Sequence, residues 1–519
     1  MDRDRTVAIE YRWGEGRAER FAEIAAEFVR LKVDLIVAST TTPAIAAKQA
    51  TSTIPIVFVG GGRPGWHRSR PKPGASRRQR HRPGSALICI AWLKKHQLEN
   101  RKGRHVPAYD LLSEAFYKDP YPTLAEMRRN DPCWFDHRLG AYVVTRYGDV
   151  SRILQEDDFS AQRVGQFTRG APDHLRGKVK VYVDALERWL LFIDPPHHTR
   201  LRERLQRAFG PALLPTITNE AKQAVRNALE DIDGAACVDA IARFAYPVPT
   251  RVLAKVFGIS DNDIERFKRW TTEIFTLVGA GVADEQAVEA GYRGVVELRD
   301  YVLGLVDDKR RAPGNDMLSA LAAPPDGEAD VEVGEEDLIG LFMSMIVAGH
   351  ETSTNLIGNA LRAVMLDRTA RDRVTGPADL PETAVDEFVR YDGPVASMLR
   401  RAKRQVVLAG TVVPEGSFLF SMLLSANRDP RQFQAPDRLD LDRPLSTHVG
   451  FGVGRHRCIG AFMARVVVRE AVQSFMRQFP NATIGDGWIW HRNTSFRGLA
   501  AMPVVLNSPA DCQLRSAAG

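Results

Sequence analysis

The chain has 519 residues, of which 44% are hydrophobic, so it can form a large core and more than one domain. Its net charge of +7 is unevenly distributed, because residues 63–104 carry 13 Lys and Arg against one acidic residue. Residues 1–62 hold 8 basic and 8 acidic residues, so residues 105–519 are left with a net charge of −5. This distribution argues against a protein that binds nucleic acid through its main domain.

Cysteines and apolar stretches indicate the compartment. The five cysteines are odd in number and far apart, and they show neither a CxxC pair nor the spacing of a zinc site. The N-terminus lacks the apolar stretch of a secretory signal, and the longest apolar stretches, residues 86–93 and 338–349, are too short to span a bilayer. We therefore expect a reduced, cytoplasmic, monomeric protein that does not bind membranes.

Residues 1–62 alternate between strand and helix patterns. Apolar strands are predicted at residues 6–11, 34–39 and 54–59, with helices at 17–32 and 43–50 between them, which gives a βαβαβ order. This segment resembles a fragment of a transporter substrate-binding protein. Such a receptor needs export and two complete lobes, so a vestigial or mis-joined leader is the preferred interpretation.

Residues 63–104 are rich in Arg, Pro, Gly and Ser and predict a disordered linker. A basic tail that touches RNA or acidic lipid is one alternative, and out-of-frame translation is another. Residues 105–507 predict a domain that is mainly α with small β-sheets, followed by a tail at 508–519. We expect strands near 142–147 and within 405–420, a long helix over about 335–366 and a shorter helix from near Pro381.

The stretch FGVGRHRCIG, residues 451–460, surrounds one cysteine with glycines and cations. Cys458 follows Arg455, His456 and Arg457 and directly precedes a predicted helix over residues 461–479. Both features favour the thiolate anion. A lone thiolate does not make a zinc site, but it suits one axial position on a haem iron. The alternative is a buried structural cysteine.

Taken together, Phe451, Gly454, Cys458 and Gly460, with Gly452 between them, resemble the haem-binding signature of the cytochrome P-450 monooxygenases. The resemblance implies the cytochrome P-450 fold over residues of about 105–507. It also implies haem b with Cys458 as the axial iron ligand, and O2 as co-substrate.

The stretch AGHETST, residues 348–354, lies on the long predicted helix and matches the same family. By resemblance, Glu351 and Thr352 deliver protons during oxygen activation, while Ala348 and Gly349 leave room for oxygen. The alternative is a surface carboxylate beside a threonine that bonds back to its own helix.

Two further groups of residues match the family. Glu387 and Arg390 lie three residues apart on one helix and can pair, and the resemblance implies a buried structural network with Arg438 as its third member. The resemblance further implies that four cationic residues hold the two haem propionates: His198, Arg202, Arg400 and His456.

These features predict a haem-thiolate monooxygenase that acts on a small hydrophobic molecule. By resemblance, its electrons come from NAD(P)H through a separate ferredoxin and ferredoxin reductase. A haem-thiolate peroxygenase or isomerase, which needs no external electrons, is one alternative. A non-enzymatic solute-binding protein or an inactive fusion product is another, suggested by residues 1–62.

Overall fold

The computed structural model describes residues 7–13, 19–30, 35–38, 41–51, 54, 56–58, 88–94, 109–165, 171–210, 213–280, 284–323, 333–444 and 447–506. The chain divides into two compact units, one that ends at Tyr109 and one that begins at Asp110. The predicted domain boundary near residue 105 and the predicted tail from residue 508 lie outside the described residues.

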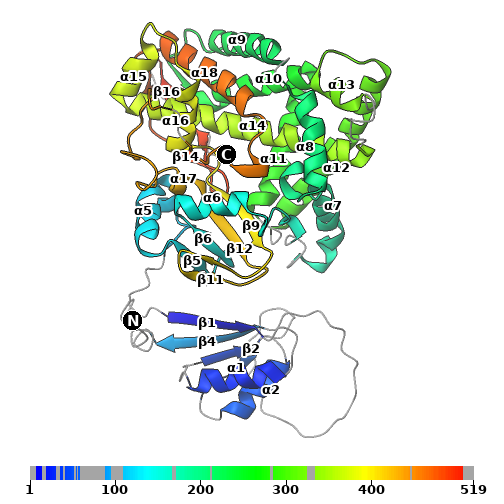
Figure 1. Ribbon diagram of the computed structural model, residues 1–519, viewed down its shortest axis with the longest axis vertical. Coiled ribbons are helices and arrows are strands. Elements are labelled where there is room, and N and C mark those ends of the chain that lie inside the picture. Colours follow the sequence, from blue (N-terminus) through cyan, green and yellow to red (C-terminus); the bar gives the residue numbers. More distant parts are fainter. Residues whose placement is uncertain are drawn as a thin grey trace. The chain divides into compact units, whose positions relative to one another are not determined.

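The first unit contains the predicted succession of strands and helices (Figure 1). Its elements in chain order are β1 (Val7–Trp13), α1 (Glu19–Arg30), β2 (Leu35–Ala38), α2 (Thr41–Ala50), β3 (Ile56–Phe58) and β4 (Ile88–Lys94). The sheet has the order β1-β4-β2-β3, with β2 and β3 parallel and β4 antiparallel to both of its neighbours. The described part of its core includes Phe21 and Phe28 of α1 and Ile36 of β2.

Strand β4 corrects one prediction. It lies within residues 63–104, which the composition assigned to a disordered linker, so this assignment is wrong for residues 88–94. The segment ICIAWLK combines β-branched and aromatic residues that favour a strand, and it pairs with β1 over its whole length. The arginine-rich part of the predicted linker, residues 63–87, and residues 95–104 lie outside the described residues.

The second unit is mainly helical (Figure 1). Its helices are α4 (Glu114–Lys118), α5 (Tyr121–Asn130), α6 (Tyr147–Gln155), α7 (Arg176–Leu186), α8 (His197–Ala208), α9 (Leu214–Glu230), α10 (Pro247–Phe257), α11 (Ile264–Ala280), α12 (Glu285–Arg311), α13 (Met317–Ala322), α14 (Glu335–Leu366), α15 (Arg368–Thr375), α16 (Glu382–Asp392), α17 (Leu423–Ala426) and α18 (Ala461–Gln478). The long helix α14 has the bounds that the sequence predicts.

Small sheets complete the second unit, so the predicted fold class is confirmed. The largest has the order β5-β6-β12-β9-β7, formed by β5 (Cys133–Asp136), β6 (Ala141–Val144), β12 (Phe418–Met422), β9 (Ser397–Ala402) and β7 (Phe159–Ser160). The others are the hairpin of β10 (Val406–Leu408) and β11 (Thr411–Val413), the pair of β14 (Ile489–Trp490) and β15 (Leu499–Ala501), and the sheet of β13 (Thr483–Ile484), β16 (Pro503–Val505) and β8 (Cys237–Asp239).

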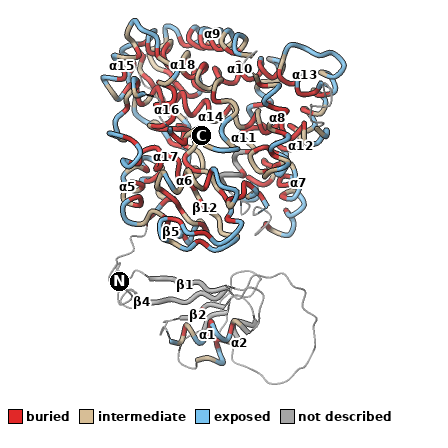
Figure 2. The backbone as a smooth tube through the Cα atoms, viewed as in Figure 1, coloured by how far each residue is buried: buried red, intermediate tan, exposed pale blue. Residues whose placement is uncertain are grey.

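Helix α14 runs through the core of the second unit. Three acidic residues in its first turn, Glu335, Glu336 and Asp337, favour the helix N-terminus electrostatically. The apolar run that follows is buried against α10, α12, α16 and α18, and Figure 2 shows the buried positions along it. Any polar side chain in the middle of α14 is therefore held at a fixed depth inside the unit.

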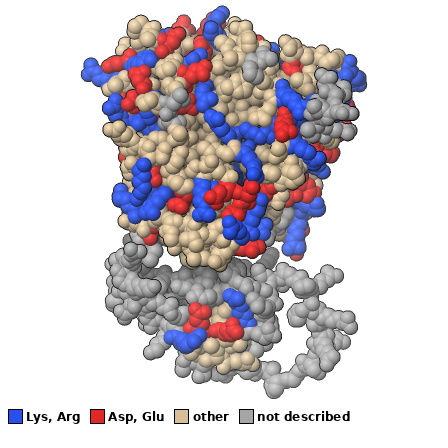
Figure 3. All heavy atoms as spheres, in the orientation of Figure 1, with Lys and Arg blue, Asp and Glu red and all other residues tan. Residues whose placement is uncertain are grey.

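Three observations bear on the predicted surroundings of the protein. No helix among the described residues is long and apolar enough to cross a membrane. On the face shown in Figure 3, basic and acidic side chains of the second unit are interspersed.

Among the described cysteines, Cys133 and Cys458 are free and Cys237 is disulfide-bonded. The disulfide departs from the expected fully reduced state, because spacing along the chain does not reveal which cysteines the fold brings together.

Candidate active site

Cys458 lies at the end of a tight loop directly before α18, as the sequence predicts. The backbone N–H of Cys458 donates to the carbonyl oxygen of Phe451 at 2.7 Å, which closes the loop. Gly452 and Gly454 have φ values of +69° and +72°, a region that favours glycine. A Cβ atom on Gly454 would also lie 3.0 Å from the carbonyl oxygen of Leu154. The glycines of the motif therefore set the backbone path that presents the thiol.

The thiol of Cys458 is accessible from one side, while burial by the surrounding protein raises its pKa. The Gly460 backbone N–H and the charges of Arg202, Arg465 and Arg457 act in the opposite direction without outweighing burial. The predicted effect of the neighbouring cations is present for Arg457, but burial outweighs it. The anion needs a further partner, which a bound metal cation supplies.

Four cationic residues come together beside this loop, and we call them the cationic cluster: His198, Arg202, Arg400 and His456. The rings of His198 and His456 have their centres 4.1 Å apart. His198 is 1% exposed, and neither of its ring nitrogens has a hydrogen-bond partner. Arg400 is 2% exposed, and its Nη1 donates to the carbonyl oxygen of Leu399 at 3.0 Å.

Among the residues that the structure describes, no carboxylate is hydrogen-bonded to the cationic cluster. Burial, followed by the neighbouring charge of Arg202, lowers the pKa of His198 to about 4. Burial, followed by the charge of Arg400, lowers the pKa of His456 to about 2. Burial also lowers the pKa of Arg400 to about 10, and the opposing attraction comes from Asp194.

Asp194 is already bound elsewhere. It accepts hydrogen bonds from the Ser160 hydroxyl at 2.6 Å and from the Ala161 backbone N–H at 2.8 Å. A buried cation without an anion is costly. The cluster is therefore suited to a ligand that brings carboxylates, and haem carries two. The residues present fit haem, with Cys458 facing the iron and the cluster facing the propionates. One nitrogen of the Arg202 guanidinium group already has a partner in the chain, because it donates to the Arg457 carbonyl oxygen at 2.7 Å.

The acid and alcohol predicted for proton delivery lie in the middle of α14. Burial raises the pKa of Glu351, against the opposing effects of His491 and of a hydrogen bond from Asn355. The Thr352 hydroxyl donates to the Ala348 carbonyl oxygen at 2.6 Å. This back-bond is the alternative that the sequence left open for Thr352. Glu351 is half-buried and accepts a hydrogen bond from Asn355 on the same helix, so it is not a freely exposed surface carboxylate.

Gly349 has a different role from the predicted one. A Cβ atom on Gly349 would lie 3.1 Å from Cδ2 of Leu253 on α10. Its small size therefore allows close packing of α10 against α14, while the room for oxygen predicted at this position stays a prediction. Ala348 next to it is half-buried, and its carbonyl oxygen accepts the Thr352 hydroxyl.

A second polar group links α16 to the segment of residues 427–443. The Arg390 guanidinium donates to both carboxylate oxygens of Glu387, at 2.7 and 2.8 Å, and both side chains are buried. Arg390 also donates to the carbonyl oxygens of Asn427, Pro436 and Arg438. These contacts support the predicted structural pair and show that its charges are satisfied by the chain itself.

The third member of this group is Arg443, and not Arg438. Arg443 Nε donates to Glu387 Oε2 at 3.1 Å, and its side chain is 13% exposed. The side chain of Arg438 is 67% exposed and pairs with Asp440 instead, although its backbone carbonyl accepts from Arg390. Both arginines follow the helix in the same polar stretch, so composition alone did not separate them. We call Glu387, Arg390 and Arg443 the ion-pair network.

Two other residues near the site were missed by sequence reasoning. His350 is 1% exposed, and its ring packs against the rings of Tyr246 and Phe267. Its neighbours Gly349 and Glu351 drew attention to the motif, whereas nothing in the pattern marks His350 as buried. Arg163, which follows β7, lies close enough to Arg400 for the two charges to repel.

The comparisons with known proteins agree with this geometry. A model of the family "Cytochrome P450" matches residues 379–500. Cytochrome P450 107B1 of Saccharopolyspora erythraea is 31% identical over 411 residues, which cover 77% of this chain and 98% of that protein. Vitamin D(3) 25-hydroxylase of Pseudonocardia autotrophica is 29% identical over 407 residues, covering 77% and 96%.

Solved structures show the same fold. The bacillaene polyketide synthase cytochrome P450 PksS of Bacillus subtilis 168 superposes with a TM-score of 0.69 at 26% identity, covering 77% of this chain and all of that one. Members of this family are oxidoreductases that bind haem b through a cysteine thiolate and use O2. By its sequence and its fold, this chain belongs to the cytochrome P450 family.

Proposed function

We propose that the protein is a monooxygenase that inserts one oxygen atom from O2 into a small hydrophobic organic molecule. Its electrons come from separate partners, a ferredoxin and an NAD(P)H-linked ferredoxin reductase. The observation that carries the proposal is the pairing of Cys458, in its glycine-shaped loop before α18, with a buried cationic cluster that lacks an anion. Relatives that bear the name of hydroxylase support the reaction class.

Haem supplies the electron-rich iron centre at which O2 is activated when it is bound. Cys458 would hold the iron. His198, Arg202, Arg400 and His456 would bind the propionates. These residues come from one loop, one helix and one strand.

Glu351 and Thr352 manage protons in this proposal. Because burial raises the pKa of Glu351, its carboxyl can hold a proton closer to neutral pH than an exposed glutamate can. The Thr352 hydroxyl donates its hydrogen bond to the Ala348 carbonyl oxygen. The lone pairs of the hydroxyl oxygen can therefore accept a hydrogen bond from water. Together they can position a water molecule and transfer a proton from the carboxyl.

The first test is the difference spectrum of the dithionite-reduced protein with and without carbon monoxide. We expect a strongly red-shifted Soret band in the natural chain, and Cys458→Ser should abolish it. Cys133→Ser is the matched control, because Cys133 is a free cysteine that is buried in β5. A red-shifted band that persists in Cys458→Ser would refute the assignment of the iron ligand.

A second experiment separates the monooxygenase from its alternatives. Turnover with ferredoxin, reductase and O2 supports the proposal. Turnover with hydrogen peroxide, and none with the reductase system, would identify a peroxygenase instead. Thr352→Ala should keep haem and divert reducing equivalents to hydrogen peroxide, and fully coupled turnover in that variant would remove Thr352 from proton delivery.

The role of the first unit is tested by truncation. A chain that begins at Asp110 keeps the second compact unit intact. We expect it to bind haem and to turn over substrate as the full chain does. Loss of both in a truncated chain that still folds would instead tie the activity to the first unit, in line with a solute-binding function.

A further inference from the structure

Arg163 is held in a fixed position in the segment that follows β7. Its Nη1 donates to the carbonyl oxygens of Ala161 and Leu191, both at 3.1 Å. The carbon of its guanidinium group lies 4.4 Å from the ring centre of Phe192. Two backbone acceptors and one aromatic face therefore fix one side of the guanidinium group, while its Nε and Nη2 hydrogens point elsewhere.

No carboxylate of the described residues bonds to Arg163. The nearest negative charge that acts on it is Asp194, which is already bound by Ser160, Ala161 and Lys403. Arg163 is partly exposed, yet the surrounding protein desolvates its guanidinium group strongly. Strand β7 pairs with β9 so that Ser160 lies opposite Arg401, and the segment that carries Arg163 therefore runs past Arg400, whose side chain lies in the protein interior.

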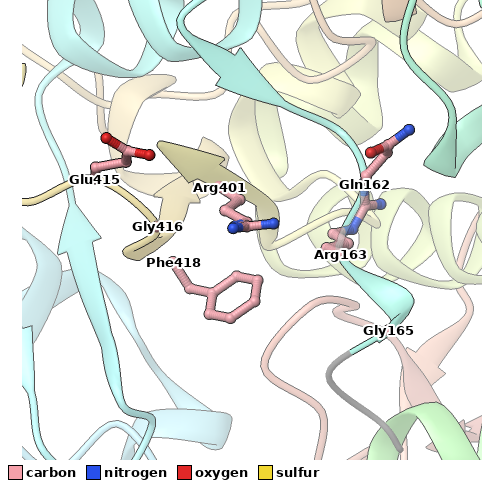
Figure 4. Close-up of a pocket in the computed structure, with 7 residues that line it drawn as sticks. All are labelled: Gln162, Arg163, Gly165, Arg401, Glu415, Gly416 and Phe418. Atoms are coloured by element: carbon pink, nitrogen blue, oxygen red, sulfur yellow. The ribbon is translucent and has the colours of Figure 1, made fainter. Parts of the chain in front are cut away.

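Arg163 lies between this interior and a surface hollow. The hollow has a volume of about 420 Å³, and both Arg163 and Arg401 line it (Figure 4). Arg401 follows Arg400 on β9, and successive side chains of a strand point to opposite faces. Arg400 is buried, whereas Arg401 is exposed toward the hollow. Arg163 thus lines the surface hollow and also lies close enough to Arg400 and His456 for its charge to act on both.

We propose that Arg163 is a further propionate-binding residue, which holds one haem carboxylate beside Arg400 from the segment after β7. The inference rests on the proposed haem function and assigns a role to a residue outside the family motifs. A planar guanidinium group whose other side is already fixed loses little conformational entropy when it binds a carboxylate through two hydrogen bonds. The carboxylate in turn supplies the charge that Arg163 and Arg400 lack.

The test compares Arg163→Met with Arg401→Met in the full-length, haem-loaded protein. Methionine keeps the length of the side chain without its charge, and Arg401 is the control because it lines the same hollow from the exposed face. Resonance Raman spectroscopy reports hydrogen bonding to the propionates through their bending band. Transfer of haem to excess apomyoglobin reports the rate of release. Arg163→Met should shift the propionate band and accelerate haem release roughly ten- to a hundredfold, the effect of one charge-assisted hydrogen bond. Arg401→Met should change neither.

Arg163→Lys keeps the test decisive if the methionine variant does not fold. Lysine retains the charge but lacks the planar group that makes two parallel hydrogen bonds. It should therefore shift the propionate band in the same direction by a smaller amount. An unchanged propionate band overturns the proposal, whether or not haem is released faster, because faster release alone also follows from a loosened loop.

A substrate carboxylate is the other source of the same chemistry, and a third measurement separates it. A long-chain fatty acid and its methyl ester are compared by the spectral shift that they cause on binding. Selective loss of the acid in Arg163→Met, with an unchanged propionate band, would assign Arg163 to the substrate and overturn the proposal. A natural protein without a red-shifted Soret band would refute the proposed function itself, which is a different outcome from a natural holoprotein whose variants are unchanged.

Discussion

The ion-pair network and the cationic cluster are each built around one buried arginine, Arg390 or Arg400, and they differ in where the anion comes from. In the network, Arg390 is fully buried and donates to both oxygens of Glu387 at 2.7 and 2.8 Å. In the cluster, Arg400 is equally buried and donates to a neighbouring backbone carbonyl. The first group is complete without a ligand, whereas the second is complete only when carboxylates are brought to it.

This difference separates folding from binding. A satisfied buried pair contributes to the stability of the chain itself, or at least costs it little, while removal of one partner is strongly destabilising. An unsatisfied cation costs stability in the chain alone, and the cost is offset when the ligand binds. Variants of the two groups should therefore respond differently to the presence of haem.

The largest expected effect comes from removing the anion of the network. Glu387→Ala leaves Arg390 and Arg443 buried without a carboxylate, which should lower the free energy of unfolding by about 3–5 kcal/mol. Urea denaturation followed by circular dichroism measures the loss. Glu382→Ala, an exposed change on the same helix, should cost less than about 0.5 kcal/mol. Equal losses in the two variants would show that the network does not support the fold.

A pH titration of stability sharpens the comparison at a neighbouring carboxylate on α16. Burial favours the neutral form of Asp386, but hydrogen bonds from His448 and Arg465 outweigh burial and lower its pKa from 3.8 to about 2. A lowered carboxylate pKa gives stability that is present above pH 4 and is lost as the pH falls toward 2.

Asp386→Asn should therefore lower the free energy of unfolding by about 2 kcal/mol at pH 6. Its stability should also change less than that of the natural chain between pH 4 and 2. Asp379→Asn, at an exposed carboxylate on the surface, is the control and should follow the natural curve. If Asp386→Asn keeps the full acid dependence, the ion pair with Arg465 is not its source.

A smaller effect distinguishes the two arginines that compete for the third place in the network. Arg443→Ala removes a partly buried donor to Glu387 and should cost about 1–2 kcal/mol. Arg438→Ala removes an exposed side chain and should cost less than about 0.5 kcal/mol, because its contribution is a backbone carbonyl that alanine retains. The reverse order in urea denaturation would restore the sequence-based choice of Arg438.

The sequence predicts those features that depend on local pattern. Helix α14 has its predicted bounds, because a long apolar run with acidic residues at its start and no proline strongly favours a helix. The loop before α18 follows the motif, because positive φ values at Gly452 and Gly454 leave few alternatives. The spacing of Phe451 and Cys458 belongs to the same local loop, which is why it identifies the family.

Features that depend on distant neighbours escape the sequence. Gly349 meets Leu253 of another helix, and nothing around position 349 reveals that contact. Arg443 and Arg438 share an irregular segment without a periodic pattern, so the direction of each side chain is set by the packed structure. Strand β4 was hidden by the basic residues around it, since its partners β1 and β2 lie more than 40 residues away.

The smallest expected change in stability is the most informative, because this variant should not lose stability without haem, whereas the other variants should. Arg400→Met removes a buried charge to which no carboxylate of the described residues is hydrogen-bonded, and burial disfavours that charge, since it lowers the pKa of Arg400 to about 10. The haem-free variant should be as stable as the natural chain or more stable by about 1 kcal/mol. The haem-loaded variant should release haem faster, because a propionate has lost its partner.

Arg390→Met is the matched control for this prediction. It is the same substitution at an equally buried arginine, but it removes both hydrogen bonds of Arg390 to Glu387 and leaves that buried carboxylate with Arg443 as its remaining cation. We expect it to destabilise the haem-free and the haem-loaded protein alike, as measured by urea denaturation of both forms. If Arg400→Met destabilised the haem-free protein as much as Arg390→Met does, the cationic cluster would be part of the folded frame, and the distinction between the two groups would fail.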